Sequence, residues 1–267
     1  MMSRIEKTFD ALRANNKKAL VVYLTAGDPN LEDSVAAALA AVEAGADILE
    51  VGVPFSDPLA DGPVIQRAMN RALEAGGGFE GALEVVRRVR EQSDVPIILF
   101  GYVNPLMWHG QRESCERFAD AGGDGLLVVD LPPEEADELK GFAAERHLDW
   151  ITLVAPSSGP ERTRMLSEAA SGFVYVISMM GVTGAKLTHT EGVSKVVSMV
   201  QDATSVPACV GFGVRDRESA RAVAEVADGV VVGSAIVKVL EENQGVEGTK
   251  AVARLVGELR AGIDEAV

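Results

Sequence analysis

The sequence has little of several residue types that mark common classes of protein. Among its 267 residues there are two cysteines and three histidines, and aromatic residues make up 5%. Cys115 lies in a polar helical segment and Cys209 in an apolar run, so they suggest no disulfide framework. The histidines stand singly along the chain, without the spacing of metal ligands. We therefore expect free thiols in a reducing cytoplasm and no metal site.

Positive charge is scarce as well. The chain has 25 Lys and Arg residues against 40 Asp and Glu residues, which gives a net charge of -15. This balance argues against nucleic acid and against an anionic membrane surface, so a phosphate ligand would have to be held locally by backbone N–H groups and helix ends. Long apolar runs are missing and the first residues are polar rather than signal-like, so we expect no membrane segment and a cytoplasmic location.

Eight short apolar runs alternate with helical segments along the chain. This alternation predicts a parallel sheet with helical crossovers, and eight such units close into a barrel of about 250 residues. Ile5, Phe9 and Leu12 stand at helical spacing, which predicts an additional helix over residues 4–15. We expect an α/β fold, a single (β/α)8 TIM barrel with an extra N-terminal helix and extra helices, in which residues 1–267 form one catalytic domain. The expected strands are residues 18–24, 48–53, 96–101, 125–129, 150–154, 173–177, 207–210 and 229–232.

The stretch from Asp47 to Pro63 carries two notable carboxylates. Glu50 stands inside an apolar run, where a charge is costly unless it is paired or used. Three prolines then favour a loop, and this loop carries Asp61. Two carboxylates in different environments can divide into a proton donor and a charged stabiliser. The residues alone leave open whether Asp61 only forms a turn or caps a helix.

Glycine-rich loops follow the last three expected strands. They are Gly-Val-Thr-Gly at 181–184, Gly-Phe-Gly at 211–213, and Gly-Ser at 233–234. TIM barrels commonly bind phosphate with the last two such loops and a helix N-terminus. Each motif alone is equally a strand-end turn, but their order favours a phosphate site.

Two other strand-end segments are less specific. Tyr102–Pro105 follows the third strand and is expected to be a loop. Asp130 follows the fourth strand, where an aspartate can be a functional residue, but a cap for a helix that begins near Pro133 explains it at least as well.

A resemblance to a known family rests on the longest of these motifs. The segment that begins at Glu50 resembles the signature of the tryptophan synthase alpha chain family nearly letter for letter: Glu-Val-Gly-Val-Pro-Phe-Ser-Asp-Pro-Leu-Ala-Asp-Gly-Pro. The resemblance extends over essentially the whole chain and implies a lyase of tryptophan biosynthesis. The implied reaction is the retro-aldol cleavage of indole-3-glycerol phosphate to indole and glyceraldehyde 3-phosphate. Glu50 and Asp61 match the catalytic pair of the family.

The resemblance also implies which residues bind substrate. Tyr23 stands where Phe is more usual in the indole site, and Phe100 stands where a smaller aliphatic residue is common. Thr183 would contact Asp61 when its loop closes, and Gly184 would donate an amide to the phosphate. The full expected binding set is Tyr23, Phe100, Tyr175, Thr183, Gly184, Phe212, Gly213, Gly233 and Ser234.

The family resemblance implies a partner and leaves alternatives. It implies a beta subunit that carries pyridoxal phosphate, in a complex of two alpha and two beta subunits, and no cofactor in this chain. One alternative is a stand-alone indole-3-glycerol phosphate lyase, and another is a different phosphate-binding barrel that relies on Lys or Cys at strand ends. Lys186 and Lys238 end no strand. A non-catalytic activator of the beta subunit would need neither Glu50 nor Asp61.

Overall fold

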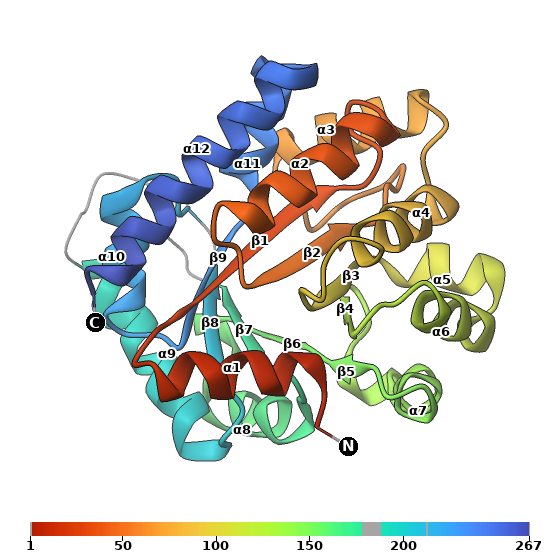
Figure 1. The fold of residues 1–267 in the computed structure, drawn as a ribbon. Coiled ribbons are helices and arrows are strands. Elements are labelled where there is room, and N and C mark those ends of the chain that lie inside the picture. Colours follow the sequence, from red (N-terminus) through yellow and green to blue (C-terminus); the bar gives the residue numbers. More distant parts are fainter. Residues whose placement is uncertain (1, 178–187, 212, 267) are drawn as a thin grey trace.

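The apolar runs form a parallel sheet that closes on itself (Figure 1). The computed structural model describes residues 2–177, 188–211 and 213–266, and their strand segments pair in the order β5-β4-β3-β2-β1-β9-β8-β7-β6. Ile151 separates β5 from β6, yet its N–H still donates to the Leu126 carbonyl at 2.9 Å. Because β5 pairs with β4 and β6 with β7, the two segments act as one strand and the predicted eight-stranded barrel is confirmed. The segments are β1 (Ala19–Thr25), β2 (Ile48–Gly52), β3 (Ile97–Gly101), β4 (Gly125–Val128), β5 (Asp149–Trp150), β6 (Thr152–Val154), β7 (Val174–Ile177), β8 (Ala208–Gly211) and β9 (Gly229–Val232).

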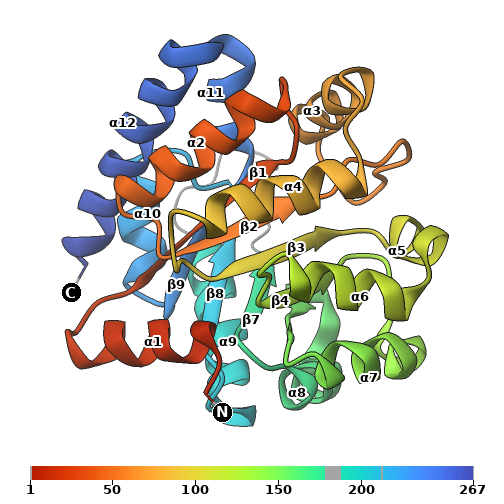
Figure 2. The same cartoon turned by 45° about the vertical axis from the view of Figure 1, so that its right-hand side comes forward.

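Helices cover the outside of the barrel in Figures 1 and 2. After β2, β3 and β9 the chain forms two helices instead of one, which gives α3, α5 and α11 beside the outer helices α4, α6 and α12. None of the helices within the described ranges is long and apolar enough to cross a bilayer. The helices are α1 (Arg4–Ala14), α2 (Leu31–Glu43), α3 (Pro63–Glu74), α4 (Phe79–Arg90), α5 (Val103–His109), α6 (Gln111–Asp120), α7 (Asp137–Glu145), α8 (Gly159–Ala169), α9 (Thr188–Ala203), α10 (Arg217–Ala224), α11 (Ser234–Glu242) and α12 (Gly245–Asp264), with short 3-10 turns η1 (Pro133–Glu135) and η2 (Pro156–Ser158).

The lower half of the barrel interior is a solid apolar core. Helix α1 lies across this end in Figure 1, and its Ile5 and Phe9 are buried there. The Phe9 ring meets Phe173 edge-on, with centroids 6.2 Å apart. Since side chains fill the bottom of the barrel, a ligand site is expected at the other end, where the strands have their carboxyl ends. The other residues of this inner core lie on the strands or directly beside them: Ala19, Val21, Ile48, Ile98, Leu127, Ile151, Phe173, Cys209 and Val231.

Aspartates at the start of three strands stabilise the bottom edge of the sheet. Each one directly precedes a strand and accepts a hydrogen bond from a backbone N–H of the neighbouring strand. These side chains satisfy donors that the strand ladder leaves unpaired, which would otherwise be costly inside the protein. The pairs are Leu20 with Asp47 (2.8 Å), Ile97 with Asp124 (2.8 Å) and Ala208 with Asp228 (3.0 Å).

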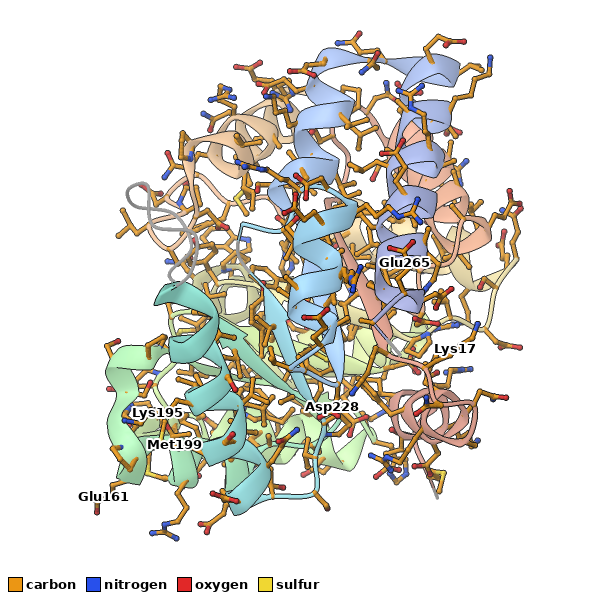
Figure 3. All side chains as sticks on the ribbon, turned by 90° about the vertical axis from the view of Figure 1, so that its left-hand side faces the viewer. Lys17, Glu161, Lys195, Met199, Asp228 and Glu265 are labelled. Atoms are coloured by element: carbon orange, nitrogen blue, oxygen red, sulfur yellow. The ribbon has the colours of Figure 1, made fainter. Side chains whose placement is uncertain are left out.

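Figure 3 looks onto the side of the barrel that α9, α10 and α12 cover. Asp228 lies at the lower end of β9 in this view, where Lys18 approaches it to 3.9 Å. The labelled Glu161 and Lys195 show where the neighbouring helices α8 and α9 lie. Glu265, after the end of α12, forms an ion pair with Arg217 of α10. Helix α9 was not predicted from the sequence, although it separates β7 from β8 as the fold requires.

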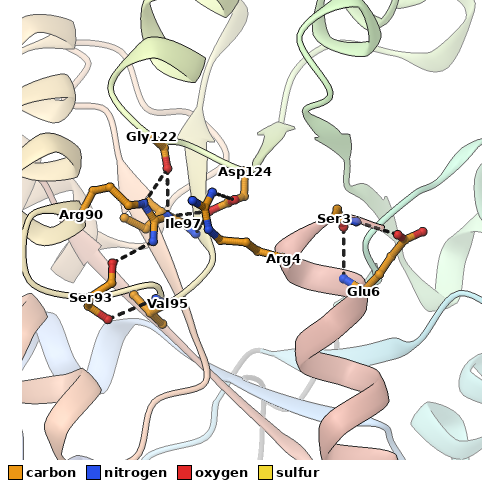
Figure 4. A network of polar contacts seen from close by, with 9 residues as sticks. All are labelled: Ser3, Arg4, Glu6, Arg90, Ser93, Val95, Ile97, Gly122 and Asp124. Carbon is orange, nitrogen blue, oxygen red and sulfur yellow. Dashed lines mark hydrogen bonds and ion pairs between the residues drawn. The ribbon is translucent and has the colours of Figure 1, made fainter. Parts of the chain in front are cut away.

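Asp124 is the centre of a buried ion cluster at the bottom of the barrel (Figure 4). Its side chain is 5% exposed and accepts from Arg4 at 2.9 Å and from Arg90 at 2.7 Å. Arg90 also donates to the carbonyls of Gly122 and Ser93. The cluster therefore ties α1 and α4 to the turns that lead into β3 and β4.

Two local predictions at the top of the barrel were wrong. Tyr102–Pro105 is not a loop, because α5 begins at Val103. Asp130 does not cap its own following helix: its Oδ1 accepts the Val103 N–H at 2.8 Å and so supports the start of α5. The side chain crosses to the neighbouring strand end, which a search for local caps does not consider.

Arg90→Ala should test the bottom cluster. We expect the free energy of unfolding to fall by about 3 kcal/mol, because the change leaves a buried carboxylate short of a partner. Urea unfolding measures this loss. Arg87→Ala on the same helix is the control, since its exposed pair with Glu84 should contribute less than about 1 kcal/mol. Equal losses in the two variants would contradict a special role for the cluster.

Candidate active site

A cavity of about 430 Å³ opens at the carboxyl ends of the strands. Eight of the eleven expected site residues line it together. The other three, Thr183, Gly184 and Phe212, lie outside the described residues. The eight are Tyr23, Glu50, Asp61, Phe100, Tyr175, Gly213, Gly233 and Ser234, and the wall is completed by Ala60, Gly62, Pro63, Val64, Ile65, Val129, Leu153, Ile177, Val214 and Val231.

Glu50 reaches the cavity from the middle of β2. It follows Ile48 by two residues, so it shares the inward face of the strand and stands above the apolar core. Only 1% of the residue is exposed, and its Oε1 has no hydrogen-bond partner among the described residues. Burial raises the pKa of Glu50 to about 8. The carboxyl group is therefore mostly protonated at neutral pH and can donate a proton into the cavity.

Asp61 lies on the loop between β2 and α3 and is held by Tyr102. The Tyr102 hydroxyl donates to Asp61 Oδ2 at 2.6 Å and accepts the Ala60 N–H at 3.0 Å. Burial raises the pKa of Asp61, and the hydrogen bond from Tyr102 opposes that shift. Burial also raises the pKa of Tyr102, so the phenol stays a donor. Asp61 is thus partly removed from solvent although it lies on a loop, and the hydroxyl of Tyr102, at the end of the neighbouring strand β3, orients its carboxylate.

Tyr102 was not among the expected site residues. Two sequence signals point to it: its match to the family pattern after the third strand, and its place directly after β3, on the same rim of the barrel as the ends of β2 and β4. Phe55 lies beside its ring, with centroids 5.2 Å apart. Together these contacts pack the Asp61 loop against the end of β3.

The wall nearest β1 and β3 is aromatic. The rings of Tyr23 and Phe100 meet edge-on, with centroids 5.1 Å apart. The Tyr23 hydroxyl is 3.2 Å from Thr25 Oγ1 and so has a hydrogen-bond partner. A Cβ at Gly52 would collide with the Tyr23 hydroxyl, so β2 needs a glycine there. With Val129, Leu153 and Ile177 close by, this part of the cavity suits a flat apolar ring.

Tyr175 reaches the cavity from the opposite part of the barrel. Its hydroxyl lies against Gly211 on β8, where any side chain would collide with the tyrosine ring. Burial raises the pKa of Tyr175 well above its ordinary value, so the group is a neutral phenol and not a base. Both inward tyrosines therefore depend on a glycine in the adjacent strand.

The loops after β8 and β9 offer backbone N–H groups. Gly213 has a φ of 84°, a conformation that favours glycine. Ser234 begins α11, and no side chain of the described residues caps this helix. The first amides of a helix lack internal partners and carry the positive end of its dipole, so they suit an anion such as a phosphate. The serine hydroxyl can add another donor.

The cavity combines an acid, an oriented carboxylate, an aromatic wall and an anion-binding end. Such a set can protonate a ring carbon, stabilise positive charge beside it, and hold a phosphate away from the reacting bond. In the parts of the chain that are described, no group of three or more His, Cys, Asp or Glu residues could hold a metal ion.

Comparison with known proteins identifies close relatives of this chain. A family model described as tryptophan synthase alpha chain matches residues 9–264. The tryptophan synthase alpha chain of Geobacter sulfurreducens is 48% identical over 262 residues, which cover 98% of this chain and 99% of that protein. The tryptophan synthase alpha chain of Marinobacter nauticus is 48% identical over 244 residues, which cover 91% of this chain and 90% of that protein.

Solved structures agree with the sequence relatives. A chain of tryptophan synthase from M. tuberculosis superposes with a TM-score of 0.89 at 41% identity, covering 98% of this chain and 99% of its own. Tryptophan synthase subunit alpha from Legionella pneumophila superposes with a TM-score of 0.90 at 37% identity, covering 99% of this chain and all of its own. The similarity thus includes the strand ends that form the cavity.

The raised pKa of Glu50 should make the free energy of unfolding depend on pH. Because the folded-state pKa of Glu50 lies near 8 and its ordinary value is 4.5, the stability associated with its bound proton is complete below pH 4.5 and is lost as the pH rises through 8. Glu50→Gln has no such proton to lose. At pH 9 we therefore expect its free energy of unfolding to be higher than that of the unmodified chain by a few kcal/mol, at about 1.4 kcal/mol per pKa unit. Urea unfolding at pH 5, 7 and 9 measures the difference, with Glu84→Gln as an exposed control. Parallel curves for Glu50→Gln and the unmodified chain would show that Glu50 is ionised in the folded state.

Proposed function

Since this chain belongs to the tryptophan synthase alpha chain family, we propose that its cavity cleaves indole-3-glycerol phosphate to indole and glyceraldehyde 3-phosphate. The observation that carries this proposal is the pair of carboxyl groups on one cavity: Glu50, unpaired and protonated near neutral pH, and Asp61, oriented by Tyr102. The chain would act in tryptophan biosynthesis as a lyase, with residues 1–267 as one catalytic domain and no cofactor of its own.

The two ends of the substrate match the two ends of the cavity. The indole ring would lie between the Tyr23 and Phe100 side and the aliphatic wall, where apolar contact and ring edges favour a flat aromatic group. The phosphate would bind the amides after β8 and β9, through Gly213, Gly233 and Ser234. Thr183, Gly184 and Phe212 are proposed to complete this end.

The chemistry requires two proton transfers at neighbouring atoms. Protonation of indole C3 by Glu50 turns the ring into a leaving group and places positive charge on the ring nitrogen. The Asp61 carboxylate accepts the indole N–H and stabilises that charge. Glu50, now ionised, takes the proton of the hydroxyl on the adjacent carbon. The carbon–carbon bond then breaks, its electron pair restores the neutral indole, and the aldehyde forms. Glu50 ends the cycle protonated as it began.

The two acids should be separable by substitution. Glu50→Gln keeps the size of the side chain but cannot transfer a proton, so we expect kcat to fall by at least about 100-fold. Asp61→Asn should lower kcat by a comparable or smaller factor through lost stabilisation of the ring nitrogen. Indole release from indole-3-glycerol phosphate measures both effects.

The control for these variants is ligand binding. The Kd of indole-3-propanol phosphate, which keeps the ring and the phosphate but has no hydroxyl at the reacting carbon, should change less than about threefold in Glu50→Gln. Turnover of Glu50→Gln at the rate of the unmodified chain would end the proposed mechanism.

The proposal includes a beta subunit as partner, with pyridoxal phosphate bound to that subunit, in a complex of two alpha and two beta chains. Exposed apolar side chains beside the cavity support a docking face. Leu59, in the loop of Asp61, is 93% exposed, and Trp108 on α5 is 84% exposed. Met107 precedes Trp108 and is also exposed. The Tyr102–Ala60 hydrogen bond joins these two segments at the same rim. Large apolar groups in this position are typical of an interface.

Addition of a beta subunit should distinguish the complex from a stand-alone lyase. We expect it to accelerate indole release and to co-purify with this chain. Trp108→Ser should weaken the association at least about tenfold, because an interface tryptophan often contributes 2 kcal/mol or more, without altering turnover of the isolated chain. Met165→Ser, on α8, is the control for loss of an exposed apolar side chain. Full activity alone and no response to the beta subunit would favour the stand-alone lyase.

We further propose a cytoplasmic location. Both cysteines are free and buried, which suits a reducing compartment.

A further inference from the structure

A cluster of four charged residues lies outside the cavity and joins three segments at the top of the barrel. Asp28 lies in the loop after β1, Arg67 and Arg71 lie on α3, and Glu241 lies at the end of α11. Helices α3 and α11 are the additional helices after β2 and β9, and both lie in the upper part of Figures 1 and 2.

The cluster is fully connected by short ion pairs. Arg71 binds both oxygens of Asp28, with Nε–Oδ1 at 2.8 Å and Nη2–Oδ2 at 2.9 Å. Its remaining Nη1 donates to Glu241 at 2.9 Å. Arg67 binds both oxygens of Glu241, at 2.7 and 2.8 Å. Bidentate arginine–carboxylate pairs fix direction as well as distance, so the three segments are held in one geometry.

The burial of these groups makes the arrangement hard to change. The Asp28 side chain is 2% exposed, and its charge requires the arginine. The Arg71 and Glu241 side chains are 26% and 25% exposed. The hydrogen bonds from Arg67 lower the pKa of Glu241 to about 2, so its carboxylate stays charged over the working range of an enzyme.

Each of the two helices starts at one end of the substrate site. Helix α3 begins at Pro63, two residues after Asp61, and α11 begins at Ser234 in the proposed phosphate site. Both Asp61 and Ser234 line the cavity. The space between the helices holds a small apolar cluster in which Ala68 of α3 and Val237 of α11 pack with Tyr23. Apolar packing keeps the two helices together but does not fix their relative orientation, because it is non-directional. The ion cluster fixes that orientation.

We propose that Glu241, together with Arg71, is a positioning residue that sets the distance between the acid end and the phosphate end of the active site. This inference rests on the proposed function, because it concerns a substrate that spans both ends. A ligand that occupies one end alone does not depend on that distance. A ligand that bridges the ends does, since a misplacement of about 1 Å can cost 100-fold in a reaction.

Binding of three ligands to Glu241→Gln tests the proposal. Indole occupies the aromatic end, glycerol 3-phosphate occupies the phosphate end, and indole-3-propanol phosphate bridges the two. We expect the Kd of the bridging ligand to rise about fivefold to tenfold, as for loss of a positioning contact. The Kd of each single-end ligand should change less than twofold. The KM for indole-3-glycerol phosphate, which also bridges the two ends, should rise by a factor similar to that for the Kd of the bridging ligand. Calorimetry on the purified chain measures all three.

Two further variants make the result specific. Glu242→Gln is the matched control, since Glu242 is the next residue on α11 and, among the described residues, forms an ion pair only with exposed Lys238, at 3.7 Å. It should leave all three ligands unchanged. Arg67→Gln removes the more exposed arm of the cluster and should give a smaller effect in the same direction.

The outcomes separate this proposal from a purely structural role. Equal weakening of all three ligands, or a lower melting temperature with no change in the bridging ligand, would overturn it. Failure of the unmodified chain to bind the bridging ligand at all would instead reject the proposed function.

Discussion

The burial of one carboxyl group on β2 is the constraint on which the active site depends. Glu50 stands directly above a solid apolar core and has little access to water. The barrel therefore raises the pKa of Glu50 by desolvation. This requires a dry floor below Glu50 and a cavity above it. Helix α1 supplies the floor by filling the bottom of the barrel with Ile5 and Phe9.

The same barrel pairs two of its other buried carboxylates, Asp124 and Asp28, with arginines. Asp124 at the bottom is as buried as many core residues, yet arginines and a backbone N–H satisfy it. Asp28 at the top is buried against Arg71. Glu50 differs because none of the described residues pairs with its Oε1. Asp149 at the start of β5 also has a buried oxygen without a partner among the described residues, but it does not line the cavity. The combination of an unpaired buried carboxyl group and a place on the cavity identifies Glu50 as a group kept for chemistry.

The sequence predicted the barrel and the acids because both signals are local. Apolar runs, glycines and the motif around Glu50 are read from neighbouring residues, and the strands followed within one or two positions. The missing information is non-local. Tyr102 reaches Asp61 across 41 residues, and Arg71 reaches Glu241 across 170. No periodicity encodes such contacts, because they arise only when the sheet closes and brings different strand ends to one rim. The start of α5 was missed for the same reason, since Asp130 supports it from the next strand.

Closure of the barrel also explains why the site tolerates aromatic residues so close to the acid. Inward side chains of adjacent strands compete for the same space at each level of the barrel. Tyr23 and Tyr175 fit because their hydroxyls lie over Gly52 and Gly211 on the neighbouring strands. These two glycines follow from packing and not from a turn, since neither has a positive φ. The aromatic wall and the strand glycines therefore form one unit. A larger residue at either glycine would therefore require a smaller residue in place of the facing tyrosine.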